Sequence, residues 1–336
     1  MKKSKKLAVG ILIVLPLLLF FFSLGVGRYQ LGPVGVFRVL LSPIFPDLAS
    51  DIPEVAQRLI FRVRLPRILA ALLIGASYGA TGASLQAIFK NPLVDSNILG
   101  VTSGAGFGAS LALLWMGNMW HAQLAAFISG LVAVLLAFLG GRLYKTTPLL
   151  VLTLMGILVG SLFNSLTSLL KYVADPLDAL PSITFWLLGS LTSITWNRIL
   201  PLIIITIAGV FFLLLIRWRM NILSLGDDEA KTLGVDPTKL KIWIIVWTTF
   251  MTASAVSVSG IIGWVGLVIP HAGRLIVGPD HKYLLPVSIG MGASFLLIVD
   301  NVARALLPGE IPLGVLTGLI GVPILIALLR RDKTGW

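Results

Sequence analysis

The sequence predicts an all-α, polytopic membrane protein of about ten transmembrane helices, and three observations support this fold class. Of the 336 residues, 57% are hydrophobic and only 12% are charged, whereas a soluble domain carries about 25% charge. Apolar runs of about 20 residues, the length that crosses the hydrocarbon core, recur along the chain. These runs are continuous rather than alternating, which favours helices over a β-barrel.

The expected spans follow one another with short polar breaks, so we predict one transmembrane domain over residues 1–336. The first span follows the lysines of MKKSKK and has no convincing small-residue cleavage site behind it, which favours a retained helix over a signal peptide. Glycines at four-residue spacing, such as Gly75 and Gly79, predict close helix packing. The ten spans are residues 7–26, 65–85, 97–116, 122–141, 149–170, 199–216, 242–259, 261–276, 284–303 and 312–329.

Basic residues predict the orientation. An even number of spans places both termini on one side, and most of the 26 Lys and Arg residues then lie on that side. By the positive-inside rule, this side is the cytoplasm. The same rule accounts for the net charge of +12 without nucleic acid as a partner.

One predicted outer segment, residues 27–64, does not follow the positive-inside rule. Its arginines either snorkel along an amphipathic surface helix or form a basic surface that receives an acidic partner. Inside the spans, Asp300 and Arg304 are spaced to form an i,i+4 ion pair near the outer end of their helix. The outer arginines are Arg28, Arg38, Arg58, Arg62 and Arg64, with Arg67 just inside the second span.

The stretch SLGDDEAKTLGVDP is a compact polar insert between two apolar runs, and with the next residue it forms the cytoplasmic segment 224–238. Its three successive acidic residues would lie in the first turn of a short helix, where negative charge suits the helix dipole. Gly234 can end that helix in a left-handed conformation, and Asp236-Pro237 can begin the next one. The insert is either an ordinary solvated loop or a rigid structure that another protein grips.

Several kinds of chemistry are disfavoured by the composition. The chain has no cysteine and three scattered histidines, so we expect neither a metal site nor a cofactor. It lacks the Gly-rich ATP-binding loop and the His-Glu-x-x-His and Gly-x-Ser-x-Gly motifs, so we expect no enzymatic activity. A stand-alone secondary transporter remains the alternative, although no series of buried carboxylates crosses the predicted bundle.

Four segments together carry a resemblance to a known family. In order, they are the RLPR-containing segment Arg64–Gly100, the polar insert, the segment Gly260–Pro286 with WVGL and Pro-His, and the closing segment Val299–Leu329. They resemble the FecCD-type permeases of ABC importers for iron-siderophore, haem and cobalamin, of which the vitamin B12 importer permease is the type. The matches keep the family's order and extend over nearly the whole chain.

The resemblance implies a type II importer permease that works as a homodimer in a bacterial or archaeal inner membrane. Two ATP-binding ABC subunits would grip the polar insert from the cytoplasm, and a soluble periplasmic or lipid-anchored binding protein would deliver substrate from outside. The substrate would be a metal chelate or a related nutrient such as an oxyanion.

The resemblance also implies roles for particular residues, carried over by motif. The residues for ATPase coupling are Asp227, Asp228, Glu229, Ala230, Leu233 and Gly234. Those for binding-protein docking are Arg64, Arg67 and Arg304. Those for a cytoplasmic gate are Asn91, Leu93, Thr146 and Thr147, the last two within a KTTPLL segment that departs from the family pattern.

Overall fold

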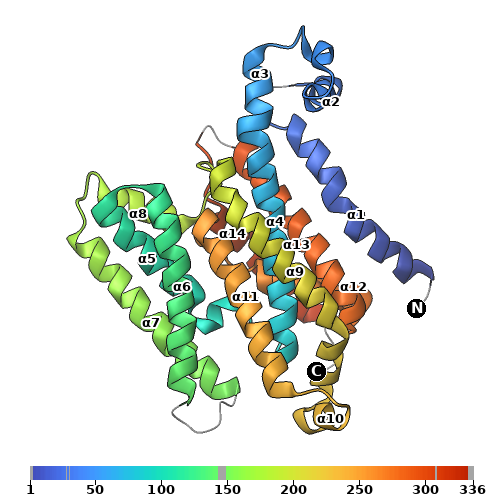
Figure 1. Ribbon diagram of the computed structural model, residues 1–336, viewed down its shortest axis with the longest axis vertical. Helices are drawn as coiled ribbons and strands as arrows, with labels where there is room; N and C mark the ends of the chain where they lie inside the picture. The colour runs from blue at the N-terminus through green and yellow to red at the C-terminus, as the bar shows by residue number, and fades with distance from the viewer. Residues whose placement is uncertain (1–2, 28, 30, 143–148, 307–308, 332–336) are drawn as a thin grey trace.

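The computed structural model describes residues 3–27, 29, 31–142, 149–306 and 309–331, and within these ranges it contains helices and no β-strand (Figure 1). The predicted all-α class is therefore confirmed. Ten helices fall on the ten predicted spans. They are α1 (Lys3–Gly25), α4 (Leu65–Phe89), α5 (Val101–Met116), α6 (Met119–Arg142), α7 (Leu149–Val173), α9 (Trp196–Leu225), α11 (Pro237–Ser259), α12 (Val265–Val277), α13 (His281–Ala305) and α14 (Leu313–Arg331).

The lengths of these helices correct two predicted spans, the third and the eighth. Six of them, α6, α7, α9, α11, α13 and α14, are long and apolar enough to cross a membrane within the described residues. Helix α5 has only 16 residues and begins at Val101 rather than at residue 97. Helix α12 has only 13 residues, or about 20 Å at 1.5 Å per residue, which is too short for a core of about 30 Å. The predicted eighth span, 261–276, begins too early because its first residues are not helical. Gly260 and Trp264 there take positive φ angles of 72° and 71°.

Short helices lie at the two ends of the bundle. The segment before α4 forms a small helical cap at the upper end of Figure 1, whereas α10 lies at the lower end, toward which α1 begins. The short elements are α2 (Pro33–Leu41), η1 (Pro46–Ala49), α3 (Glu54–Leu59), the π-helical turn η2 (Ile60–Arg64), η3 (Ser96–Leu99), α8 (Ala179–Leu188) and α10 (Asp227–Thr232). Helix α4 continues directly from α3 and η2, so the cap is joined to the bundle by one unbroken helical segment.

Helix α4 is held in the centre of the bundle by glycine contacts that we call the α4 seam. A Cβ added to Gly75 would lie 2.2 Å from the carbonyl oxygen of Gly292, and one added to Gly79 would lie 2.1 Å from that of Ser288. Gly82 meets the carbonyl oxygen of Gly266 in the same way, at 1.9 Å. The seam therefore brings the backbone of α4 against the backbones of α13 and α12, as the glycine spacing predicted.

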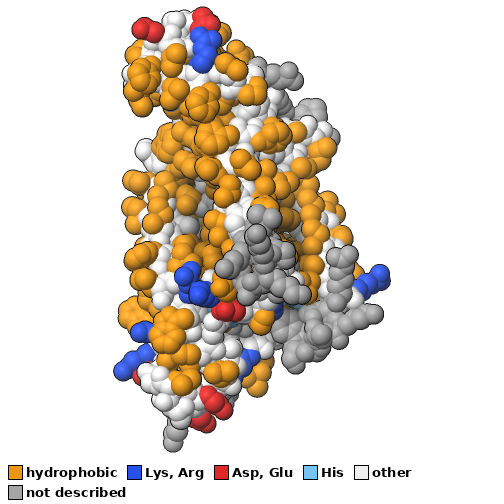
Figure 2. Space-filling view, turned by 90° about the vertical axis from the view of Figure 1, so that its right-hand side faces the viewer, with side chains coloured by type: hydrophobic (Ala, Val, Ile, Leu, Met, Phe, Trp, Pro, Cys, Tyr) orange, Lys and Arg blue, Asp and Glu red, His pale blue; other side chains and the backbone are white. Residues whose placement is uncertain are grey.

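The outer surface of the bundle suits a membrane. Figure 2 shows hydrophobic side chains over the middle of one face, while most Lys, Arg, Asp and Glu side chains lie toward its two ends. Burial differs between the spans: 72% of the α11 window and 67% of the α13 window are buried, but only 28% in α7 and in α14. Helices α7 and α14 are therefore at the periphery of a single chain.

The α4 seam predicts a strong effect of one methyl group. Gly79→Ala should lower the melting temperature of the detergent-solubilised protein, because its Cβ meets a backbone atom that no rotamer change can move. Overpacking of this kind costs about 1–3 kcal/mol. The matched control is Gly10→Ala on α1, where an added Cβ meets nothing within 4 Å. Equal melting temperatures for the two variants would show that the α4 seam is not tightly packed.

Candidate functional site: helix α10, the 91–93 turn and the outer arginine cluster

Helix α10 has the local structure that the polar insert predicted. It begins after Gly226, carries its three acidic residues in the first turn, and buries Ala230 completely. Gly234 then takes a φ of 77°. The side chain of Asp236 accepts a hydrogen bond from the backbone N–H of Lys239 at 3.1 Å, so it caps α11. That hydrogen bond holds the pKa of Asp236 below its usual range.

One ion pair joins α10 to α11 and one backbone hydrogen bond closes its C-terminal turn, while its outer side stays free. The ammonium of Lys241 on α11 lies 2.6 Å from a carboxylate oxygen of Asp227, and the N–H of Val235 donates to the carbonyl of Ala230 at 2.9 Å. The side chain of Asp228 is 93% exposed, and Leu233 is also exposed. Helix α10 is thus a short projection with an acidic and partly apolar outer surface.

The turn after α4 lies at the same end of the molecule as α10. Lys90 ends α4 in the left-handed conformation, and the side-chain oxygen of Asn91 accepts a hydrogen bond from the N–H of Leu93 at 2.9 Å. The predicted Asn-Pro turn is present, and Leu93 is 55% exposed. Two further residues of the predicted gate, Thr146 and Thr147, lie outside the described residues.

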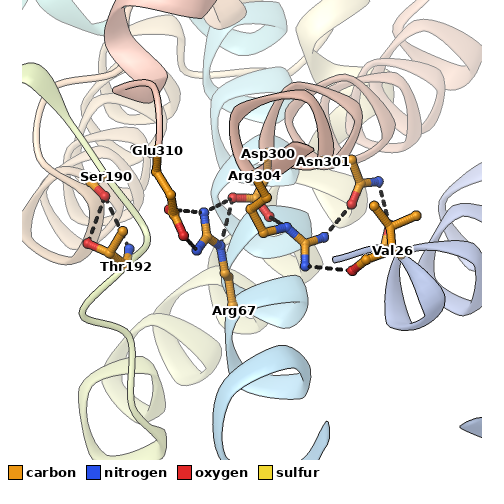
Figure 3. Close-up of polar contacts among 9 residues, drawn as sticks. Val26, Arg67, Ser190, Thr192, Asp300, Asn301, Arg304 and Glu310 are labelled. Carbon is orange, nitrogen blue, oxygen red and sulfur yellow. Dashed lines mark hydrogen bonds and ion pairs between the residues drawn. The ribbon is translucent and has the colours of Figure 1, made fainter. Parts of the chain in front are cut away.

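At the opposite end, Arg67 and Asp300 form the centre of a buried ionic cluster (Figure 3). Arg67 Nε donates to Asp300 Oδ1 at 2.9 Å. Its two terminal nitrogens bind both carboxylate oxygens of Glu310, at 2.8 and 2.7 Å. The side chain of Asp300 is fully buried and that of Arg67 nearly so, whereas the side chain of Glu310 is 32% exposed.

Arg304 extends this cluster toward α1. Its Nε lies 3.2 Å from Asp300 Oδ2, which confirms the predicted i,i+4 pair. Its terminal nitrogens donate to the side-chain oxygen of Asn301 and to the carbonyl of Val26. Asn301 in turn donates to Ser23 Oγ at 2.7 Å. One carboxylate, that of Asp300, therefore serves two arginines and ties together α1, α4 and α13.

Arg64 is buried beside this cluster in a different environment. Its guanidinium donates to the main-chain carbonyls of Leu24 and Tyr29, both at 2.6 Å, and burial lowers its pKa. Near it is a cavity of about 660 Å³. Its polar lining includes Arg64, Arg67, Ser190, Thr192, Arg304 and Glu310.

These positions change how the outer arginines are understood. The sequence left open a snorkelling surface or a basic face for an acidic partner. In the structure Arg38 pairs with Asp51 and Arg58 pairs with Glu54 on the surface, while Arg64 and Arg67 are buried. Sequence reasoning did not single out Glu310, which lies far along the chain from Arg67. The glutamate in LPGEIP was the only available signal, and its partner is set by tertiary structure.

Comparisons with known proteins match nearly the whole chain to one family of permeases. Residues 13–331 match the FecCD transport family. The molybdate import system permease protein MolB of Haemophilus influenzae is 42% identical, over 93% of this chain and 92% of the relative. The cobalamin import system permease protein BtuC of Halobacterium salinarum is 40% identical, over 84% and 76% of the two chains. The hemin transport system permease protein HmuU of Yersinia pestis is 31% identical, over 98% and 96%.

Two solved structures are similar to this chain in fold. A chain of a putative metal-chelate type ABC transporter in an inward-facing conformation superposes with a TM-score of 0.86 at 40% identity, covering 96% of this chain and 99% of the other. A chain of PsaBC from Streptococcus pneumoniae in complex with Fab has a TM-score of 0.59 at 15% identity, covering 85% and 95%, which shows a likeness of fold alone.

The arginine cluster predicts that Asp300 is needed for stability. Asp300→Ala should lower the free energy of unfolding by about 3–5 kcal/mol, because two buried arginines lose a shared counter-charge. Asp51→Ala is the matched control, since it removes one partner of an exposed arginine pair and should change stability far less. Thermal unfolding in detergent checks both variants. An Asp300→Ala protein as stable as the wild type would contradict this account of the cluster.

Proposed function

The chain belongs to the FecCD transport family, and on that premise we propose that two copies of it form the membrane channel of an importer powered by separate ATPase subunits. As a member of this family it is a multi-pass membrane permease of an ABC transporter, and such a permease is not itself an enzyme. The importer takes up a metal chelate or a related nutrient such as an oxyanion. Both termini lie in the cytoplasm of a bacterial or archaeal cell.

The observation that carries this proposal is the exposed helix α10. It joins two membrane-spanning helices, projects acidic residues into water, and is fixed at its base by Asp227 and Ala230. A short rigid helix of this kind transmits force better than a flexible loop, because little of an applied displacement is absorbed by bending. The ATPase subunits contact it through the exposed Asp227, Asp228, Glu229, Leu233 and Gly234, and the buried Ala230 takes part in coupling by holding α10 in place.

The exposed face of α7 supports a path between two copies of the chain. Ser161, Asn164, Ser165 and Ser168 follow one another at helical spacing and are exposed in the single chain. Hydrogen-bonding side chains are unfavourable against lipid tails, so this face suits a water-filled path at a two-fold axis. The low burial of α7 and α14 is consistent with the same interface.

The outer arginine cluster supports docking of a binding protein. Arg64, Arg67 and Arg304 line the cavity described above, and the partly exposed Glu310 forms an ion pair with Arg67 there. A carboxylate of the binding protein can replace Glu310 on Arg67 or pair with Arg64, whose present partners are neutral carbonyls. Such charge pairing would set the register of the encounter.

The gate lies at the turn after α4. Leu93 projects from the turn that the Asn91 side chain closes, at the end of the molecule where α10 lies. A bulky apolar side chain there can block a path sterically when two copies come together. Thr146 and Thr147 belong to the same proposed gate on the evidence of sequence position alone.

The names of the relatives bear on the substrate class. They describe permeases for molybdate, cobalamin, iron chelatin and hemin, which share a metal and a need for active uptake. The molybdate permease and the structure of a putative metal-chelate transporter are both about 40% identical to this chain. Our proposal therefore covers chelates and oxyanions of metals.

Reconstitution tests the proposal directly. Proteoliposomes that contain the permease, its cognate ATPase and its binding protein should accumulate one of four probes: molybdate, cobalamin, hemin or a ferric siderophore. Uptake should require ATP and all three components, because the permease lacks its own ATP-binding loop. Uptake by the permease alone, driven by an ion gradient, would instead establish a stand-alone secondary transporter.

The same assay tests the role of α10. Gly234→Val places a β-branched side chain at a φ of 77°, which is a strained conformation for it. We expect uptake per ATP hydrolysed to fall about tenfold, since a distorted α10 loses its grip on the ATPase. Gly117→Val is the matched control. Gly117 has a φ of 59° and follows α5 at the opposite end of the molecule, so its strain should leave uptake per ATP unchanged.

A further inference from the structure

A polar junction joins the end of α9 to the start of α13. The side-chain amide of Asn221 donates to Asp280 Oδ1 at 2.7 Å. The side-chain oxygen of Asn221 accepts from the backbone N–H of His281 at 2.9 Å and lies 3.0 Å from His281 Nδ1. The amide nitrogen and the amide oxygen of Asn221 thus bind two adjacent residues, Asp280 and His281, at the start of α13.

The junction is built to hold a fixed geometry. Asp280 Oδ1 also accepts from the backbone N–H of Lys282 at 2.9 Å, so the residue that receives Asn221 is already the N-cap of α13. The imidazole of His281 is nearly fully buried. An amide oxygen only accepts hydrogen bonds, so Nδ1 of His281 carries the ring hydrogen in this arrangement. A hydrogen bond to a carboxylate is stronger than one between neutral groups.

The place of Asn221 in the chain gives the junction its significance. It lies on α9 less than two turns before Leu225, the last residue of that helix. Gly226 follows, and α10 begins at the next residue. A displacement of α10 therefore reaches Asn221 through a short piece of continuous helix.

On its other side, the junction leads to the 91–93 turn. Helix α13 starts at the junction and packs along α4 through Ser288 and Gly292 of the α4 seam, where backbone touches backbone. Helix α4 ends at Phe89, directly before the turn that carries Asn91 and Leu93. Packed backbones move together, so a shift of α13 carries α4 with it.

Helix α10 has a second connection to the bundle, and its character differs. The Lys241–Asp227 ion pair joins α10 to α11, with Asp227 about half exposed. Pairs that reach water are weak and are screened by salt. The Asn221–Asp280 hydrogen bond is also exposed, but the Asn221–His281 contacts are partly buried. The donors and acceptors of the junction point in fixed directions, so it constrains orientation as well as distance.

We propose that Asn221 is a positioning residue for transport, which transmits the displacement of α10 to α13 and, through the α4 seam, to the turn at Leu93. This inference rests on the proposed function, since it needs an ATPase that moves α10. It assigns to Asn221, Asp280 and His281 a role in coupling although none of them belongs to α10 itself.

The chain contains no cysteine, which allows a direct measurement on the complete transporter. A single cysteine at Leu93 carries a spin label, the partner subunits are made cysteine-free, and the distance between the labels of the two copies is measured with and without ATP and vanadate. The Leu93 label in otherwise wild-type complex should change distance on trapping. With Asn221→Ala, we expect the ratio of responding to non-responding molecules to fall about tenfold, which is equivalent to about 1.4 kcal/mol.

Two further variants separate transmission from simple stabilisation. Asn221→Asp places a carboxylate against Asp280 and should also abolish the response. The double variant Asn221→Asp with Asp280→Asn re-forms a donor–acceptor pair in the opposite sense, so it should recover part of the response. Thr184→Ala is the matched control, because Thr184 Oγ1 donates to the carbonyl of Leu180 within α8 and belongs neither to the junction nor to the polar insert.

The outcomes distinguish the inference from the function on which it rests. If Asn221→Ala only lowers the melting temperature and the Leu93 labels still respond fully, the junction is structural and the inference is wrong. A response that Thr184→Ala lowers as much as Asn221→Ala does would equally overturn it. If the Leu93 labels fail to respond to ATP and vanadate in the otherwise wild-type complex, then the proposed coupling function itself fails.

Discussion

Close backbone contact along α4 is the constraint on which the rest of this structure depends. Helices in lipid gain nothing from burying apolar surface against one another, so packing and hydrogen bonds must hold them. Gly75, Gly79 and Gly82 supply this packing by letting α4 touch α13 and α12 without intervening side chains. Larger residues at these positions would separate the helices and weaken many contacts at once, since dispersion forces fall quickly with distance.

The seam also determines where polar groups are placed. Helices held at backbone distance leave little room for water, so buried polar groups must find partners within the protein. At one end Asp300 is shared between Arg67 and Arg304, and at the end near α10 Asn221 accepts a hydrogen bond from the backbone of the buried His281. The central helices are thereby joined at both ends. The faces of α7 and α14, which are less buried than those of α11 and α13, are the surfaces that our proposal assigns to a second copy.

The sequence predicted the parts of this structure that depend on local pattern. Apolar runs located the long helices, and glycine spacing predicted close packing. The residues of the polar insert predicted the acidic first turn of α10, its left-handed end at Gly234 and the start of α11 at Asp236-Pro237. Helix α12 was predicted too long because hydropathy alone does not reveal the non-helical backbone at Gly260 and Trp264. The partners of Arg67 could not be predicted, since Glu310 and Asp300 reach it only through tertiary folding. Asn221 gave no signal for the same reason, because a polar residue at a helix end is ordinary until its neighbours are known.

The most direct test of the account is to find which end of the molecule an ATPase contacts. A cysteine-directed photo-crosslinker placed at Asp228, whose side chain is 93% exposed on α10, is compared with one at Val55, which is 71% exposed on α3 at the opposite end. In membranes containing the assembled transporter, we expect the ATPase subunit to be captured from Asp228 and not from Val55. Capture from Val55, or from neither position, would contradict the assignment of α10 as the element through which ATP hydrolysis drives transport.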